Sequence, residues 1–463
     1  MTGAAAHDWL DAQEPALRAR LYDFARIASV STDPAYAQGM MNGAAFLAAY
    51  LREIGFDHVA VNPTPGHAIL TGEWMGAPGA PVILVYGHYD VQPPDPLDQW
   101  HSDPFEPELR DGRIYARGIS DDKGPLMVAL GAMEALMATA GGLPVNVRLL
   151  IEGAEEMGSA HLEDFVTAHP GLVTADFLLS ADGAMWRADL PTVTVASRGM
   201  AALNVTVRGA AKDLHSGRYG GGVPNAAQVL VTMLAALHDP ETGAVAVPGF
   251  YDGVVPPDAE TRAALADIPF DEAGFLAGLG VRQGTGEAGY SFLERNWLRP
   301  TLEINGLTSG YTGPGFKTVI GAVAEAKISC RLVPGQDPGR ILDLLEAELT
   351  RLCPDCATVS FARKPGVAWP SALPLDHPGL RLAMEVLEEI YGQPARAVRM
   401  GATIPIAEMF DRVLGMGTVF FSFSTADEDY HAPNEFFRLE RWQDGLRAWV
   451  TYLARLAAME RPE

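Results

Sequence analysis

The sequence predicts an α/β protein whose mostly parallel sheet is interrupted in sequence by an inserted α+β domain. Three observations support this. Apolar runs alternate with helical patterns, three of these runs precede residue 181, and a fourth follows residue 418. Strands that alternate with helices form mostly parallel sheets, so the runs are expected in one sheet. Because the fourth run is far from the others, the chain between them is expected to form a domain of its own, which suits a length of 463 residues.

The four apolar runs do not alternate with polar residues, which is typical of strands buried on both faces. They are VILVY at 82–86, VNVRLLI at 145–151, FLLS at 177–180 and VFFSFS at 419–424. Helical patterns are found at 15–28 and 124–140. These elements together predict the first domain.

The inserted segment has its own order of elements. Apolar and polar residues alternate at 200–208, and a helix with proline near its start follows at 224–238. The remaining predicted elements are strands at 301–305 and 322–333, a helix at 338–353 and a strand at 357–362. This β-α-β-β-α-β order is the ferredoxin-like arrangement. Residues 239–300 break the pattern and receive no assignment. The predicted domains are 1–197 and 369–463, which form one unit, and 198–368.

Composition excludes several classes of partner. The 34 Lys and Arg against 58 Asp and Glu give a net charge of -24, which repels nucleic acid and anionic membranes. The first fifteen residues, MTGAAAHDWLDAQEP, have neither a basic region nor an apolar one, so no signal peptide is expected. Every apolar run is shorter than the roughly 18 residues of a membrane span. Three cysteines are too few for a disulfide framework, and the CxxC at 353–356 follows a predicted helix end, which does not suit a redox site. A cytoplasmic protein is expected.

Side chains able to bind metal follow each predicted strand. In chain order they are His88 and Asp90, then Glu152, Glu155 and Glu156, then Asp182, then Asp429 and His431. A fifth loop, RGISDDKG, brings Asp121 and Asp122 to the start of a helix. Because the carboxyl ends of the strands of an open α/β sheet meet at one edge, these side chains are expected in one place.

Crowded carboxylates repel one another unless they are protonated or neutralised by cations. Imidazole with carboxylate is the ligand mixture of zinc or manganese, and a catalytic site leaves a position open for water. One loop histidine or one solvated acidic pair would carry little weight, but five loops together predict a metal site. Two ions about 3.5–4 Å apart can polarise a carbonyl and lower the pKa of water to about 7.

Several motifs resemble those of one enzyme family. They are GHYDVQP, RGISDDKGP, EGAEEMGS, DLHSGRYGGGVPN, ISCRLVP and the loop of His431. They resemble the co-catalytic zinc metallopeptidases, and within these the carnosinases and cytosolic nonspecific dipeptidases, from about Leu21 to the C-terminus. The resemblance implies a catalytic domain with two metal ions, Zn²⁺ first and Mn²⁺ as the alternative. It also implies an inserted lid domain that forms a homodimer.

The resemblance assigns the metal ligands residue by residue. It implies one ion held by His88, Asp121 and Asp182, and a second held by Asp121, Glu156 and His431. Asp121 would be the bridge, and its peptide bond to Asp122 is cis in relatives. Asp90 would accept a hydrogen bond from the ring of His88 and so fix its tautomer.

The resemblance also assigns residues to the reaction and the substrate. Glu155 would be the general base, moving a proton from water to the leaving amine. His215 of the partner subunit would stabilise the oxyanion. Arg331 would pair with the terminal carboxylate of a small peptide, and Thr318 and Thr403 match substrate-contacting positions. Relatives commonly have Gly-Gly-Ser at 401–403, where this chain has Gly-Ala-Thr, which leaves substrate size open.

Three functions remain open from the sequence. The first is a dinuclear dipeptidase, favoured by the closeness of the motifs and by aspartate rather than glutamate at position 182. The second keeps both metal ions but acts on N-acyl amino acids or longer peptides, as a deacylase or carboxypeptidase. The third is a binding or scaffold protein without metal, which the complete ligand set and Glu155 argue against.

Overall fold

The computed structural model describes residues 2–458, which divide by packing into two compact units. Within these residues, the first unit comprises the chain up to Val195, Leu373–Val398 and the chain from Met409 onward. The second comprises Ala196–Ala372 and Arg399–Glu408. The chain passes between the units within β8 (Thr192–Ser197), β16 (Arg396–Met400) and α13 (Pro405–Leu414), and just after β15 (Ser371–Ala372).

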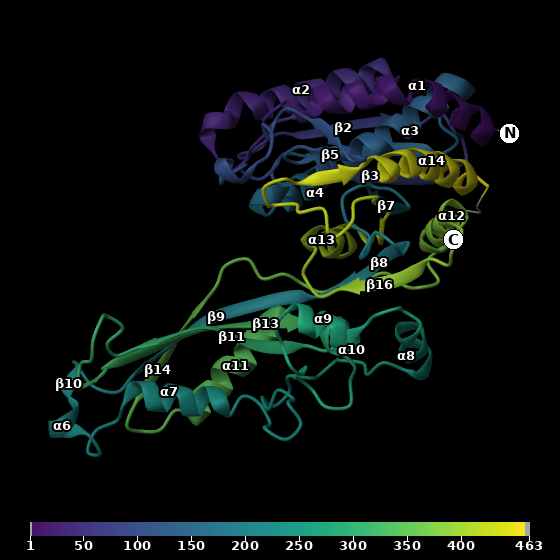
Figure 1. The fold of residues 1–463 in the computed structure, drawn as a ribbon. Coiled ribbons are helices and arrows are strands. Elements are labelled where there is room, and N and C mark those ends of the chain that lie inside the picture. Colours follow the sequence, from purple (N-terminus) through teal and green to yellow (C-terminus); the bar gives the residue numbers. More distant parts are fainter. Residues whose placement is uncertain (1, 459–463) are drawn as a thin grey trace. The chain divides into compact units, whose positions relative to one another are not determined.

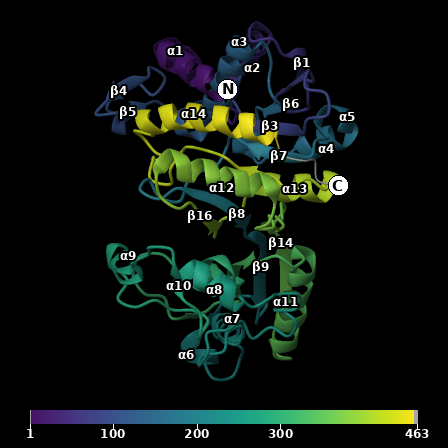
Figure 2. The same cartoon turned by 90° about the vertical axis from the view of Figure 1, so that its right-hand side faces the viewer.

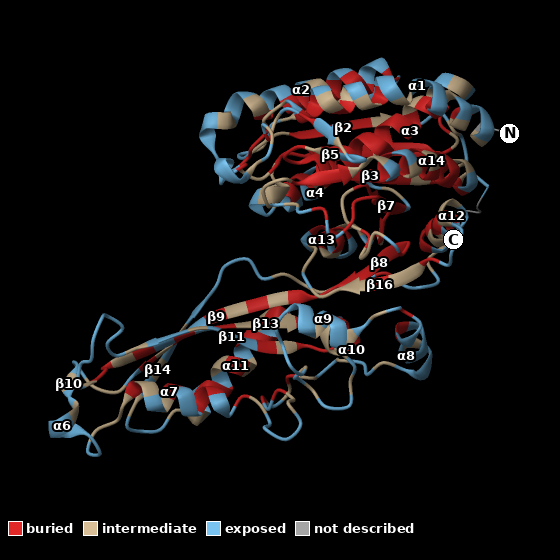
Figure 3. Ribbon diagram, viewed as in Figure 1, coloured by how far each residue is buried: buried red, intermediate tan, exposed pale blue. Residues whose placement is uncertain are grey.

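The first unit is built on a six-stranded sheet in the order β1-β2-β6-β3-β7-β17. Figure 1 labels β2, β3 and β7 of this sheet. The strands are β1 (Asp57–Asn62), β2 (Ile69–Trp74), β3 (Val82–His88), β6 (Asn146–Glu152), β7 (Phe177–Ser180) and β17 (Thr418–Phe420). Strands β6, β3, β7 and β17 are neighbours in this order and run parallel to one another. Strand β2 is antiparallel to both of its neighbours, β1 and β6. The prediction of four buried strands in one mostly parallel sheet is confirmed, although the last strand ends at Phe420 rather than 424. Figure 3 shows β3 and β7 as buried.

Helices pack with this sheet into one hydrophobic core. These helices are α1 (Thr2–Ala25), α2 (Ala37–Glu53), α3 (Gly124–Ala140), α12 (Pro378–Tyr391) and α14 (Leu439–Leu456). The short helices α4 (Leu162–Ala168) and α5 (Pro170–Val173) follow β6 in the chain. The range predicted for α3 is confirmed, and its apolar residues up to Leu136 are buried all round. Helices α12 and α14 run side by side, as Figure 2 shows.

Helix α1 differs from the prediction, which began it at residue 15. The structure continues the helix through Pro15, although proline lacks the N–H that an interior position uses. Ala6, Leu10, Leu17 and Leu21 are all buried at helical spacing. Burial of this apolar face on both sides of the proline therefore decides where the helix begins.

A small antiparallel sheet joins two distant segments of the first unit. It has the order β18-β5-β4, with β4 (Glu108–Arg110), β5 (Arg113–Tyr115) and β18 (Phe436–Arg438). In the register, Phe436 is opposite Tyr115 and Arg438 is opposite Arg113. The loop that precedes β18 therefore lies beside the loop that follows β5.

The second unit has a four-stranded antiparallel sheet in the order β11-β13-β9-β14. Its strands are β9 (Gly199–Arg208), β11 (Thr301–Ser309), β13 (Val323–Leu332) and β14 (Thr358–Arg363), and its long helices are α7 (Ala226–Ala235) and α11 (Pro338–Leu352). The predicted β-α-β-β-α-β order is confirmed. Alternate residues of β9 and β13 are buried, so one face of the sheet packs with these helices into a second core.

The segment 239–300, which the sequence left unassigned, contains three short helices. They are α8 (Ala259–Ala266), α9 (Glu272–Gly278) and α10 (Phe292–Trp297), capped by Asp258, Asp271 and Ser291. Helices of this length show too few turns for a periodic pattern to stand out. The unit also contains a two-stranded sheet of β10 (Leu214–His215) and β12 (Val319–Ile320), with the single turn α6 (Ser216–Tyr219). Across the described residues, no helix combines the length and apolar character that a membrane span requires.

Candidate metal centre

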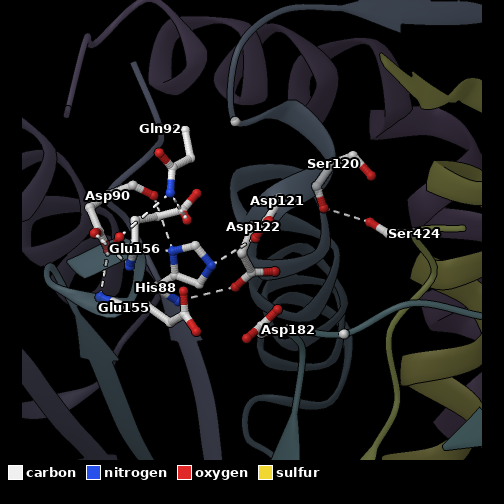
Figure 4. A network of polar contacts seen from close by, with 12 residues as sticks. His88, Asp90, Gln92, Ser120, Asp121, Asp122, Glu155, Glu156, Asp182 and Ser424 are labelled. Atoms are coloured by element: carbon white, nitrogen blue, oxygen red, sulfur yellow. Dashed lines mark hydrogen bonds and ion pairs between the residues drawn. The ribbon is translucent and has the colours of Figure 1, made fainter. Parts of the chain in front are cut away.

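Five side chains predicted to bind metal lie at one edge of the parallel sheet. Figure 4 shows four of them, His88, Asp121, Glu156 and Asp182. His88 is the last residue of β3, and Asp182 follows β7 by two residues. Glu156 lies in a single turn (Glu155–Met157) after β6. His431 belongs to the loop after β17, and Asp121 lies in a turn (Ile119–Lys123) that leads into α3. Because β6, β3, β7 and β17 are parallel neighbours, their carboxyl ends bring these side chains together.

The five side chains form two donor groups that share Asp121. One group is His88, Asp121 and Asp182, the other is Asp121, Glu156 and His431, and in each the donor atoms lie within 4.8 Å of one another. Nε2 of His88 lies 2.9 Å from Oδ1 of Asp121, and Nε2 of His431 lies 3.0 Å from Oδ2. Each oxygen of Asp121 thus faces a different histidine, as a bridging carboxylate requires. One histidine with two carboxylates in each group fits a divalent ion such as zinc or manganese.

Burial and hydrogen bonds within this cluster shift the pKa values of its histidines and of Asp182. Hydrogen bonds to Asp121 and Glu156 raise the pKa of the His431 ring to about 10. Burial raises the pKa of Asp182 to about 6. Burial lowers the pKa of His88, but hydrogen bonds to Asp121 and Asp90 outweigh it, so that the pKa lies well above its usual value. The cluster therefore favours positive charge between its carboxylates, whether as protons or as metal ions.

Asp90 connects His88 to the turn that bears Glu155 and Glu156. Nδ1 of His88 lies 3.0 Å from the backbone oxygen of Asp90 and 3.4 Å from its Oδ1. The carboxylate of Asp90 accepts hydrogen bonds from the backbone N–H of Glu155 at 3.2 Å and of Glu156 at 3.1 Å. Asp90 is fully buried, so it fixes the ring and the turn in one arrangement.

Glu155 precedes a predicted ligand but belongs to neither donor group. Burial raises the pKa of its carboxyl group well above the usual value. Among the residues that the structure describes, none donates a hydrogen bond to this carboxylate. A carboxylate with a raised pKa and free oxygens beside a metal site is suited to accept a proton and return it.

Two polar residues that the sequence did not single out contact the predicted ligands. Gln92 donates from Nε2 to Oε2 of Glu156 at 2.7 Å. Glu435 accepts a hydrogen bond from the backbone N–H of Asp121 at 3.2 Å. Gln92 is part of GHYDVQP, and Glu435 follows His431 by four residues, so nearness to the motifs was the available signal. The peptide bond between Asp121 and Asp122 is cis, as the resemblance implies.

The other predicted site residues belong to the second unit. His215 is the last residue of β10 and is exposed. The backbone N–H of Ser216 donates a hydrogen bond to the backbone oxygen of Thr318 at 3.1 Å. Arg331 donates from Nη1 to Oγ1 of Thr403 at 2.9 Å.

A cavity of about 710 Å³ in the second unit is lined by Arg331 and by Arg198. Arg198 is 7% exposed and donates from Nε to the backbone oxygen of Gly401 at 2.8 Å. Burial, together with the charge of Arg331, lowers the pKa of Arg198 to about 10. Neither guanidinium forms an ion pair within the described chain, although Glu303 lines the same cavity. Two neighbouring guanidinium groups without an ion-pair partner suit a carboxylate ligand.

Comparisons with known proteins agree with this geometry. Residues 84–455 match the family described as Peptidase family M20/M25/M40. The Cys-Gly metallodipeptidase dug1 of Schizosaccharomyces pombe is 29% identical over 414 residues, which cover 88% of this chain and 87% of that protein. The crystal structure of human carnosine dipeptidase 1 has a TM-score of 0.77 at 27% identity and covers 99% of each chain. The M20 family metallo-carboxypeptidase Sso-CP2 of Sulfolobus solfataricus has a TM-score of 0.80 at 28% identity, covering 96% of this chain and 99% of its own.

Proposed function

This chain belongs to peptidase family M20/M25/M40 and is a metal-dependent hydrolase of amide bonds, and we propose that its substrates are dipeptides. The observation that best supports a hydrolase with two metal ions is the shared Asp121. Its two oxygens face His88 and His431 and so unite two donor groups. Two similar proteins, dug1 of Schizosaccharomyces pombe and human carnosine dipeptidase 1, are named as dipeptidases.

Two zinc ions are the proposed cofactors, with manganese as the alternative. Their ligands would be the two donor groups that meet at Asp121. When bound, such ions polarise the scissile carbonyl and lower the pKa of water to about 7. Asp90 keeps the ring of His88 in place, and Glu155 takes a proton from water and returns it to the leaving amine.

Acid should weaken metal binding at this site. Because Asp121 and Glu156 raise the pKa of His431 to about 10, its ring binds a proton that a metal ion has to displace below that pH. Each proton released on binding makes the apparent affinity fall about tenfold for each unit by which the pH is lowered. A titration with Zn²⁺ at several pH values measures this slope, and an affinity independent of pH would show that His431 is not a ligand.

The second unit is proposed to bind the substrate. Arg331 would bind the terminal carboxylate of the dipeptide, and its hydrogen bond with Thr403 holds the guanidinium in a fixed direction. Thr318, whose backbone oxygen lies beside the residue after His215, would contact the substrate as well. We place the enzyme in the cytoplasm as a homodimer, in which the second unit acts as lid and dimerisation domain.

A panel of substrates tests the choice of dipeptides. Free dipeptides, tripeptides and N-acetyl amino acids are assayed with the same enzyme in the presence of Zn²⁺ or Mn²⁺. We expect kcat/KM to be highest for free dipeptides. The second candidate is a carboxypeptidase, because Sso-CP2 of Sulfolobus solfataricus is named as one. Faster hydrolysis of tripeptides or of N-acetyl amino acids would replace the dipeptidase proposal with a carboxypeptidase or a deacylase.

His215 is proposed to act on the active site of the partner subunit, which subunit mixing can test. The variants His215→Ala and Glu155→Ala are each expected to be inactive. In a mixed dimer, the subunit that keeps Glu155 receives an intact His215 of the partner subunit, so one of its two sites is complete. Random exchange makes about half of the dimers mixed, so about a quarter of wild-type activity should return.

Exchange of subunits is measured independently by mass tags. Wild-type enzyme passed through the same exchange procedure is the control for losses during handling. If exchange is complete and the mixture remains as inactive as its parents, His215 does not act across the dimer.

A further inference from the structure

A buried carboxylate outside both donor groups holds the loop that presents Asp121. Glu435 is 1% exposed and lies in the loop before β18. Its Oε1 accepts hydrogen bonds from the backbone N–H of Ser120 at 2.9 Å and of Asp121 at 3.2 Å. Its Oε2 accepts from the backbone N–H of Gly118 at 2.8 Å and from Nη1 of Arg117 at 2.7 Å. Four donors on two oxygens use the acceptor capacity of the carboxylate.

The backbone of Glu435 holds the same loop. Its oxygen accepts from the N–H of Ala116 at 3.2 Å, which extends the pairing of β18 with β5. Four residues earlier, the same segment presents His431, whose Nε2 lies 3.0 Å from Asp121. One segment therefore supplies a proposed metal ligand and also fixes the backbone of the bridging one.

The position of the Asp121 carboxylate depends on the backbone conformation of Asp121. Asp121 has φ −128° and ψ 90°, which are not helical values, although the turn leads directly into α3. Its N–H points to Glu435. Because the two oxygens of Asp121 face two different histidines, a rotation of its backbone would move both oxygens from their places at once.

A second buried carboxylate, Glu428, serves as a natural comparison. It is also fully buried and accepts a hydrogen bond from Oγ of Ser120 at 2.6 Å. Its other donors are the backbone N–H of Thr425 and Arg438 and the Arg438 guanidinium. Glu428 thus contacts the Asp121 loop through one side chain but accepts nothing from the backbone of the loop.

We propose that Glu435 is a positioning residue that sets the backbone of Asp121 so that its carboxylate can bridge two metal ions. This rests on the proposed ligand role of Asp121. Glu435 itself belongs to neither donor group, and it acts through the N–H groups of residues 118–121.

The variant Glu435→Gln tests this role, with Glu428→Gln as the matched control. A glutamine amide has one acceptor oxygen and one NH₂ group, so in either orientation its NH₂ would face donors that now meet a carboxylate oxygen. For Glu435→Gln we expect metal affinity, measured by competition with a chelator, to fall by about 10–100-fold, the range for residues that support metal ligands. The absorption spectrum of the Co²⁺-loaded protein should also change. Glu428→Gln should keep the affinity and the spectrum of the wild type.

The outcomes separate the role of Glu435 from the proposed function. A wild-type chain that binds fewer than two ions would contradict the proposed function rather than the role of Glu435. Two ions bound by Glu435→Gln with wild-type affinity and spectrum would overturn the role of Glu435. An equal loss in Glu428→Gln would overturn it too, because any buried carboxylate near the loop would then suffice.

Circular dichroism shows whether the variant folds. Should Glu435→Gln fail to fold, the double variant Arg117→Gln with Glu435→Gln removes both charges of the buried pair together, which proteins tolerate better than loss of one. A folded double variant with weakened metal binding supports the proposal. Wild-type metal binding, or failure of this variant to fold as well, overturns it, because Glu435 would then be needed only for stability.

Discussion

Replacing Glu155 by Gln is expected to lower kcat on dipeptides by about 10²–10⁴ while both metal ions stay bound. Glu155 belongs to neither donor group, and no described residue donates a hydrogen bond to its carboxylate. Glutamine has nearly the same shape but cannot take a proton from water, so the proton transfer is lost without disturbing the ligands. The measurements are kcat by steady-state kinetics and metal content by elemental analysis.

The neighbouring residue is the control for this variant. Glu156→Gln removes a proposed ligand whose Oε2 lies 3.1 Å from Nε2 of His431. It should weaken metal binding, whereas Glu155→Gln should not. If Glu155→Gln loses metal and Glu156→Gln retains it, the two assignments are reversed.

Removal of the metal ions is expected to abolish activity, and added Zn²⁺ or Mn²⁺ is expected to restore it. The donor groups hold three carboxylates and two histidines, and no other group at this edge is proposed to polarise the carbonyl. The chain is dialysed against a chelator, its metal content is measured, and activity is followed as each ion is added back. Full activity in a chain shown by elemental analysis to contain no metal would contradict the two-metal proposal.

The sequence predicted the elements whose residues are buried in a regular pattern. The strands at 82–86 and 177–180 are apolar except for Ser180, and the alternation at 200–208 reflects a strand with one buried face. The side chains predicted to bind metal could be expected together because four of them follow predicted strands of one sheet, whereas Asp121 comes from a separate loop at the start of a helix. Their proximity in the structure agrees with that reasoning, while their roles remain a proposal.

Other features could not be read from the sequence because distant contacts decide them. Pro15 suggested the start of α1, but burial of Ala6 and Leu10 extends the helix beyond it. The helices of 239–300 are too short to show a period. Glu435 looked like one more acidic loop residue, since its contacts with Gly118 and Asp121 span more than 300 residues of sequence.

The order in which the chain is synthesised sets the order in which the two donor groups can form. His88, Asp121 and Asp182 are all made before the second unit, whereas His431 follows Asp182 by 249 residues, the difference of 431 and 182. At about 5–20 residues per second, translation of that interval takes roughly 12–50 s. During this time a nascent chain contains all three residues of the first donor group but neither His431 nor Glu435, which by our proposal positions Asp121. The second group is completed only once His431 has been made, so a product truncated before that residue would lack one of the two groups.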